Sequence, residues 1–311
     1  MSNDNLIYAK SRILDILSEL DDFELDNISQ WMCSHSYRKD LEEKKCMNIS
    51  EKYLKDIGNT IKAMVPFEAE MSSENIVPPT IGDQADCNAI NTCHIDEFLY
   101  DEDEVCELVT NGKFNRHYCL ECNSRNTKEL ILISHSMSRK SLLYMFRVLL
   151  PKDLEDKQVL DVGSRLGAVL YGAYYFSNAG SILGVEMNKD CCEIQERIIT
   201  QYSMDNNRIK VIHSDILKRS DVVQSADVII INVLDFFVDI EIHKQIWYFF
   251  KKYLKKGTYL VCNRSMADTL GYLDMFEEFM NWLSICKPGQ LENEIFFDID
   301  EQSELFLYTV N

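Results

Sequence analysis

The sequence contains no long hydrophobic run. No stretch approaches the roughly 18 consecutive apolar residues that a membrane-spanning helix needs. The N-terminus, MSNDNLIYAK, carries acidic and polar residues instead of the apolar core of a secretory signal. Because no export route is visible, the 11 cysteines are expected in a reducing compartment, as thiols or metal ligands. The sequence therefore predicts a cytoplasmic or nuclear protein with no membrane partner.

Basic residues are also scarce. The chain has 32 Lys and Arg against 51 Asp and Glu, which gives a formal net charge of −19. Such a protein repels phosphate backbones unless a local basic patch or a basic partner intervenes. The balance favours a protein, another basic partner or a small molecule over nucleic acid, and it leaves RNA open. The length of 311 residues allows one main domain and smaller units beside it.

Composition and periodicity divide the chain into five regions. Apolar residues near the helical period of 3.6 predict a small helical module at the N-terminus. Pro78 and Pro79, among Ser, Asn and Gly, indicate a linker, and Ser138 is a predicted N-cap of a helix that ends at Leu150. The predicted regions are a helical N-terminal region (1–65), a linker (66–86), a Cys/His-rich module (87–125), a strand and helix leading into the core (126–150) and the main domain (151–311).

From residue 151 onward, β-rich segments alternate with helical ones. The predicted strands are Gln158–Val162, Ile182–Glu186, Ile209–His213, Val228–Asn232 and Thr258–Cys262. This alternation predicts an α/β fold with a parallel doubly wound sheet. A last helix is predicted over 270–285. Two further β-rich runs, Ile295–Ile299 and Leu305–Val310, are joined by a turn and predict an antiparallel C-terminal hairpin.

Residues with chemical functions follow the predicted strands at their carboxyl ends. The first strand runs into the segment DVGSRLG, residues 161–167, whose glycines allow a sharp turn and a close approach to a ligand. The second ends at Glu186, about 20 residues past the glycine loop, where an acid can bind both hydroxyls of a ribose. Asp215 and Asn232 follow the third and fourth strands. A dinucleotide dehydrogenase fits less well, because the glycine spacing is not G-x-G-x-x-G.

The run VLDVGSRLGAVLYGAYYFSNAGSILGVEMN, with HSDI and ADVIIIN behind it, resembles the class I S-adenosylmethionine-dependent methyltransferases. The resemblance covers residues 157 to about 263 and implies a Rossmann-like, seven-stranded sheet closed by the C-terminal hairpin. Within that class, the loop and the strand ends GVE and IIIN are most similar to the non-SET histone-lysine methyltransferases of the telomeric-silencing-disruptor type. The sequence departs from the usual loop at Arg165, where a glycine is common, and from that family's paired Asn at Val233.

The resemblance implies a part of S-adenosylmethionine for each strand end. The glycine loop would surround the methionine part, and Asp161 would accept a hydrogen bond from its ammonium. Glu186 would bind the ribose and Asp215 the adenine amino group, while Met187 and Ile216 would sandwich the adenine ring. The residues expected to contact the cofactor are Asp161, Gly163, Ser164, Gly167, Glu186, Met187, Asp215, Ile216 and Asn232.

The fourth strand ends at the position where the methyl group would face its acceptor. It lacks the Asn-Pro-Pro-aromatic sequence that holds a nucleobase amine, and no Pro-Cys pair offers the nucleophile of cytosine C5 enzymes, so N- or O-methylation remains. Asn232 could orient an amine, and Asp235 could accept a proton or pair with a cationic substrate. Phe236 and Phe237 could line an acceptor channel, although core packing is the simpler interpretation. Asn232 and Asp235 are the catalytic candidates. Together with the charge balance, the resemblance implies a methyltransferase that acts on a protein or another macromolecule. A catalytically degenerate interaction module with structural zinc and a small-molecule methyltransferase are the alternatives.

The cysteine-rich module contains two pairs that suit zinc. A C-x-x-C sequence places two thiolates on one face of a tight turn, as tetrahedral Zn²⁺ requires. The predicted ligands of a structural Zn²⁺ are Cys87, Cys93, Cys119 and Cys122, with Cys106, His94 or His117 as substitutes. A group of free thiols is the alternative. For His135, just ahead of the main domain, a structural role is favoured over a catalytic one.

Overall fold

The computed structural model describes residues 3–77, 87–121, 125–232, 234, 236–287 and 305–311. The chain divides into two compact units, Met1–Ile49 and Ser50–Asn311. Helix α3, Tyr37–Lys62, contributes to both units. Among the residues that the structure describes, no helix combines the length and apolar character needed to cross a membrane.

The first unit contains helices α1 (Asn3–Leu17) and α2 (Asp22–Cys33) and the beginning of α3. Helix α2 begins with a capping box, in which the Asp21 side chain accepts from Glu24 N and the Glu24 side chain accepts from Asp21 N. Many large apolar side chains of α1 and α2 are exposed: Leu6, Ile7, Tyr8, Ile13, Leu14, Ile16, Phe23, Trp31 and Met32.

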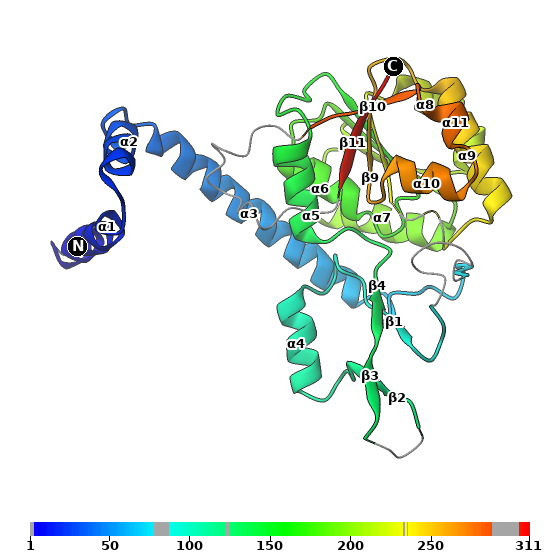
Figure 1. Ribbon diagram of the computed structural model, residues 1–311, viewed down its shortest axis with the longest axis horizontal. Coiled ribbons are helices and arrows are strands. Elements are labelled where there is room, and N and C mark those ends of the chain that lie inside the picture. Colours follow the sequence, from blue (N-terminus) through cyan, green and yellow to red (C-terminus); the bar gives the residue numbers. More distant parts are fainter. Residues whose placement is uncertain (1–2, 78–86, 122–124, 233, 235, 288–304) are drawn as a thin grey trace. The chain divides into compact units, whose positions relative to one another are not determined.

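The second unit is built on a central sheet with seven described strands (Figure 1). The strands are β5 (Gln158–Val162), β6 (Ser181–Glu186), β7 (Ile209–His213), β8 (Val228–Ile231), β9 (Tyr259–Cys262), β10 (Leu283–Ile285) and β11 (Phe306–Val310). Their order across the sheet is β10-β11-β9-β8-β5-β6-β7. Strands β5 to β9 run parallel, and β11 is antiparallel to both β9 and β10.

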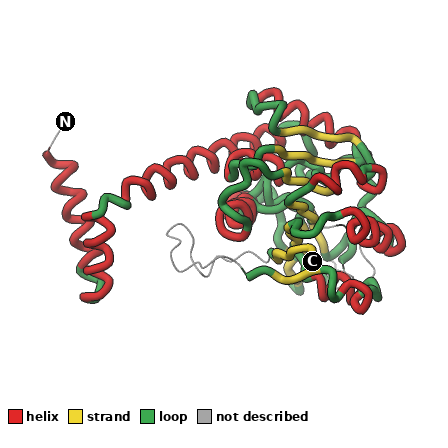
Figure 2. Tube along the Cα trace, turned by 90° about the horizontal axis from the view of Figure 1, so that it is seen from above, coloured by secondary structure: helices red, strands yellow, loops and turns green. Residues whose placement is uncertain are grey.

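Helices lie on both faces of this sheet (Figure 2). They are α5 (Arg139–Tyr144, continued by a π-helical turn at Met145–Leu149), α6 (Ala168–Phe176), α7 (Lys189–Gln201), α8 (Ser220–Ser225), α9 (Ile240–Tyr253), α10 (Met266–Tyr272) and α11 (Phe276–Phe279). A large apolar cluster joins α8 to α11 to the strands, with Trp247 and Phe250 of α9 fully buried against Leu260 of β9. Because both faces are covered, the central strands are apolar throughout, as in Val228–Ile231.

The five predicted parallel strands are confirmed as β5 to β9, with small shifts at their ends. The predicted helix over 270–285 is wrong. Helix α10 ends at Tyr272, Asp274 adopts a positive φ of 56°, and the segment continues as α11 and then as β10. Strand β11 forms as predicted but takes β10 as its antiparallel partner. The predicted partner, Ile295–Ile299, lies outside the described residues.

Between α3 and α5, the described part of the chain forms two small sheets and helix α4. Strand β1 (Thr92–His94) pairs in parallel with β4 (Ile131–Ile133), and β2 (His117–Cys119) pairs with β3 (Thr127–Glu129). Helix α4, Glu102–Thr110, lies between β1 and β2 in the chain. The predicted N-cap at Ser138 is confirmed, since its side chain accepts from Ser141 N. This pairing places His94 beside Ile133, two residues before His135.

Candidate functional site

The turn between β5 and α6 has an unusual backbone. Gly163, Arg165 and Gly167 all have positive φ angles, of 74°, 43° and 87°. A Cβ on Gly167 would lie 2.6 Å from the ring of Tyr171, so this position requires glycine. Apart from Gly163 itself and its two chain neighbours, no described atom lies within 4 Å of the Cβ position at Gly163. The turn therefore presents open backbone at Gly163, where a ligand can approach closely.

Asp161, the fourth residue of β5, carries a buried carboxyl. The residue is only 3% exposed, and no described side chain or backbone N–H donates to this carboxyl. Burial, and secondarily the nearby Glu186, raise the pKa of Asp161 to about 8. At neutral pH this carboxyl is therefore largely protonated, and a cation placed beside it would restore the charged form.

Glu186 ends the neighbouring strand β6 and is held by two backbone groups. Its Oε2 accepts from Arg165 N at 2.8 Å and its Oε1 from Asn188 N at 2.7 Å. Burial raises the pKa of Glu186, while these backbone hydrogen bonds oppose the shift. Each carboxylate oxygen has more than one lone pair, so both can still accept a ligand hydroxyl.

The buried side-chain amide of Gln195 forms hydrogen bonds with the turn between β5 and α6. Gln195, on α7, is fully buried and accepts from Ser164 Oγ at 2.9 Å, while its Nε2 donates to Arg165 O at 2.7 Å. Gln195 was not among the residues predicted from the sequence. The available signal was an amide on the buried face of α7, next to Ile194 and Ile198.

Two further predicted residues follow the sheet's edge strand, β7. The side chain of Asp215 accepts from Leu217 N at 2.9 Å and so begins a 3₁₀ helix at Ile216–Lys218. Ile216 is buried, whereas Met187, after β6, is 64% exposed. Since Glu186 pairs with His213 across the two strands, Met187 and Asp215 follow adjacent strand ends.

The end of β8 is joined to the segment ahead of the main domain. Asn232 Nδ2 donates to His135 O at 3.3 Å. The His135 ring lies 5.0 Å from the Phe236 ring and 4.9 Å from the Phe237 ring. Phe236 is buried against Cys87, which supports core packing for that ring, and Phe237 is half-buried. The catalytic candidate Asp235 lies outside the described residues.

His135 is not suited to act as a base. It is 6% exposed, and burial, followed by the effects of His94 and Arg165, lowers its pKa to about 2. A general base works best with a pKa near the operating pH. His94, whose ring centroid lies 4.2 Å away, also has a lowered pKa, mainly because it is buried. The structure therefore agrees with a structural role for His135.

Arg165, which replaces a common glycine, turns its side chain into a buried ionic network. Its Nε and Nη2 form a fork with Glu74, at 2.6 and 3.1 Å, and its Nη2 also donates to Ala69 O. Its Nη1 lies 3.2 Å from Asp96 Oδ2, which also accepts from Ser136 Oγ. The side chains of Arg165, Glu74 and Asp96 are all at least nine-tenths buried. This network could not be predicted from the sequence, because its partners are distant in the chain.

The three predicted zinc ligands that the structure describes, Cys87, Cys93 and Cys119, are not gathered into one site. Within the described ranges, no group of three or more His, Cys, Asp or Glu side chains could hold a metal ion. Cys87 is buried against Ile133 and Phe236, whereas Cys93 packs against a different apolar cluster. Cys119 is exposed, and Cys122 lies outside the described residues. The assignment of Cys87 and Cys93 to one site is therefore corrected, because each thiol packs in a separate apolar cluster.

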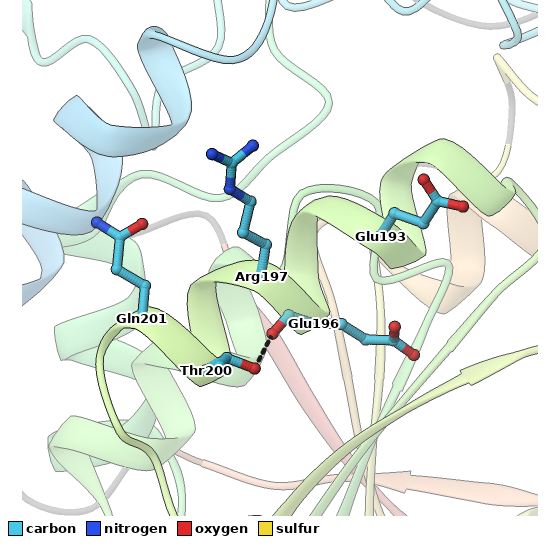
Figure 3. A pocket seen from close by; sticks show the side chains of 5 residues that line it. All are labelled: Glu193, Glu196, Arg197, Thr200 and Gln201. Carbon is cyan, nitrogen blue, oxygen red and sulfur yellow. Dashed lines mark hydrogen bonds between the residues drawn. The ribbon is translucent and has the colours of Figure 1, made fainter.

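A surface pocket lies elsewhere, along the outer side of α7 (Figure 3). It is lined by the exposed residues Glu193, Glu196, Arg197, Thr200 and Gln201. The only hydrogen bond drawn among them runs from Thr200 Oγ1 to the backbone oxygen of Glu196. None of the residues at the strand ends lines this pocket, so it is not the predicted site.

Comparisons with known proteins identify similar solved structures only. No protein-family model and no curated protein matches the chain. An RNA methyltransferase from Salinibacter ruber, in complex with S-adenosylhomocysteine, is 15% identical over 55% of this chain and 88% of that chain, with a TM-score of 0.36. An O-methyltransferase from Bacillus cereus, in complex with the same molecule, is 14% identical over 58% and 84%, with a TM-score of 0.38. A precorrin-6y C5,15-methyltransferase from Geobacter metallireducens is 12% identical over 55% and 84%, with a TM-score of 0.36.

The narrower resemblance to histone-lysine methyltransferases finds no support in these comparisons. The chain itself has an α/β fold, with a mostly parallel central sheet covered by helices.

Proposed function

We propose that the chain is an S-adenosylmethionine-dependent methyltransferase whose site lies at the carboxyl ends of β5, β6, β7 and β8. The observation that carries the proposal is the pair of buried acids on either side of the open turn. Asp161 has no described donor, and Glu186 keeps free lone pairs beside the same turn. A ligand with both a cationic group and a ribose diol matches this pair, and S-adenosylmethionine carries both.

Each strand end then has a defined task. Asp161 would hold the ammonium of the methionine part, and Glu186 would accept from the ribose hydroxyls. Asp215 would accept from the adenine amino group. Buried Ile216 and exposed Met187 offer apolar surface on adjacent strand ends, which suits a flat ring between them.

When bound, S-adenosylmethionine supplies an activated methyl group that an acceptor displaces from a sulfonium. The protein's task is to place the acceptor in line with that methyl group and to exclude water. Asn232 lies at the end of β8, and its Nδ2 is fixed by His135 O, which leaves its Oδ1 to orient an acceptor N–H or O–H. Asp235 remains the candidate that removes the acceptor's proton.

The proposed acceptor is a protein or another macromolecule, methylated on nitrogen or oxygen. The formal charge of −19 supports a basic partner and disfavours nucleic acid. A degenerate interaction module was favoured by Arg165 in the glycine loop. That support is removed because Arg165 adopts a positive φ like the flanking glycines and directs its side chain into the ionic network.

Calorimetric titration with S-adenosylmethionine and S-adenosylhomocysteine tests the proposal. We expect micromolar binding by the wild-type chain, and binding at least about tenfold weaker by Glu186→Gln, which loses a charged acceptor. The matched control is Glu193→Gln, since Glu193 is an exposed acid on α7 whose described ion pair is with Lys189. Absence of binding by the folded wild-type chain would overturn the proposal.

A further inference from the structure

A segment far upstream of the main sheet crosses the candidate site. Residues 69–77, here called the strap, make contacts at three places along their length. At its first residue and just past its middle, Ala69 O and the Glu74 carboxylate both accept from Arg165. In the middle, Ser73 Oγ donates to Asp190 Oδ2 at 2.6 Å and accepts from Asn188 Nδ2 at 3.0 Å. At the end, Val77 N donates to Phe236 O at 3.0 Å.

These contacts fix where the strap runs. Arg165 follows β5, Asn188 follows β6 and Phe236 follows β8. The three strands are neighbours in the order β8-β5-β6 and run parallel, so their carboxyl ends share one edge of the sheet. A segment that touches all three ends must cross this edge. Asp161, Glu186 and Asn232 lie at the same edge, so the strap crosses the place proposed for the cofactor.

Arg165 is the strongest of the strap's three attachments. Its guanidinium meets Glu74 in a two-pronged arrangement, which fixes direction as well as distance. Its backbone N–H donates to Glu186, and its backbone carbonyl accepts from Gln195. Arg165 therefore belongs to the turn between β5 and α6 through its backbone, and it is bonded to the strap through its side chain.

We infer that Arg165 is a positioning residue that holds the strap across the cofactor, so that the strap forms the outer wall of the site. This inference rests on the proposed function. The cofactor enters and leaves only when the strap is displaced, and the bound cofactor in turn holds the strap in place. Weakening the strap's attachments should therefore speed cofactor release more than it lowers the stability of the fold.

The test measures S-adenosylhomocysteine dissociation by stopped flow, with the full chain and three variants. Glu74→Gln removes the charge of the fork, and we expect dissociation about tenfold faster. Ser73→Ala removes the exposed middle attachment without disturbing any buried group, and we expect dissociation about fivefold faster. The matched control is Glu70→Gln, an exposed strap acid with no described ion pair, which should leave the rate unchanged. Thermal melts identify any variant that fails to fold.

Hydrogen exchange gives a second measurement on the wild-type chain. Addition of S-adenosylhomocysteine should slow amide exchange across residues 69–77, because the bound molecule holds the strap down. Binding without this protection, together with unchanged release in folded Glu74→Gln and Ser73→Ala, would overturn the inference and leave the proposed function standing. No binding by the wild-type chain would instead remove the proposed function itself.

Discussion

The environment of Asp161 disfavours the ionised form of its carboxyl group. Its carboxyl is buried without a described donor, and its pKa is raised to about 8, against about 3.9 for an unperturbed Asp. Between these two pKa values, the Asp161 carboxyl therefore keeps its proton in the folded state and loses it in the unfolded state. Stability rises with pH only where the unfolded state binds more protons, so here the free energy of unfolding falls from about pH 4 to about pH 8.

Replacing Asp161 by Asn should therefore stabilise the chain in a pH-dependent way. At pH 8 we expect the melting temperature to rise by about 3–8 °C, and at pH 5, where the native carboxyl is protonated, the effect should be small. Differential scanning calorimetry at the two pH values measures the difference. Equal shifts at both values would contradict the assigned pKa direction.

Proton release upon ligand binding gives an independent measurement at the same residue. At pH 7 the Asp161 carboxyl of the free protein is mainly protonated, and an ammonium placed beside it lowers its pKa. Binding of S-adenosylhomocysteine should then release close to one proton. Calorimetry in buffers of different ionisation enthalpy reports this number. Asp161→Asn should abolish whatever part of the release comes from this carboxyl, and a release that persists in the variant would assign it elsewhere.

In the turn between β5 and α6, Gly167 is needed because a side chain has no room there, whereas Gly163 is needed for the close approach of a ligand. Gly167→Ala forces a Cβ to 2.6 Å from the buried Tyr171 ring at a positive φ, and we expect a loss of about 2–5 kcal/mol in the free energy of unfolding. Gly163→Ala meets no described atom, so its loss should be about 1 kcal/mol, while cofactor binding should weaken clearly. Urea unfolding and calorimetric titration measure both quantities. Similar losses of stability in the two variants would contradict this assignment.

Elements with strong local signals were predicted well from the sequence. The five parallel strands are short apolar runs between helical segments, and Ser138 is a local capping signal. The segment 270–285 was mistaken for one helix because β10 exists through its pairing with β11, which lies more than 20 residues further along the chain. Apolar spacing alone does not reveal such a partner.

In the candidate site, too, features set by neighbouring residues could be predicted, and features set by residues distant in the chain could not. The acids Asp161, Glu186 and Asp215 could be found because each lies within two residues of the carboxyl end of its own strand. The environment of Arg165 could not, since Glu74 and Asp96 lie 91 and 69 residues away in the chain. Cysteine spacing was misleading because Cys87 contributes to an apolar cluster with Ile133 and Phe236. The spacing of cysteines in the sequence shows whether they could share a metal ion, but the packing of the folded chain determines which thiols lie together.

At the scale of the whole molecule, every described site residue belongs to the unit Ser50–Asn311. A fragment that begins at residue 50 should bind S-adenosylhomocysteine with an affinity within about twofold of the full chain. Ser50 is a favourable first residue for the shortened α3, and the fully buried Leu54, Ile57 and Ile61 keep that helix attached. Calorimetric titration of the two chains makes the comparison. A folded fragment that binds much more weakly would assign a part of the site to residues 1–49.

The distances along the chain within the Arg165 network have a consequence for biosynthesis. A ribosome adding about 5–20 residues per second needs roughly 5–18 s to progress from Glu74 to Arg165, 91 residues later. During that time Glu74 and Asp96 have left the peptidyl transferase centre without the cation that neutralises them, and β8, which follows β5 in the chain, has not been made. The proposed cofactor site is thus completed late in translation. A nascent chain stalled before β8 would expose the strap to chaperones and proteases, and cofactor supplied during synthesis would find no site until that strand was complete.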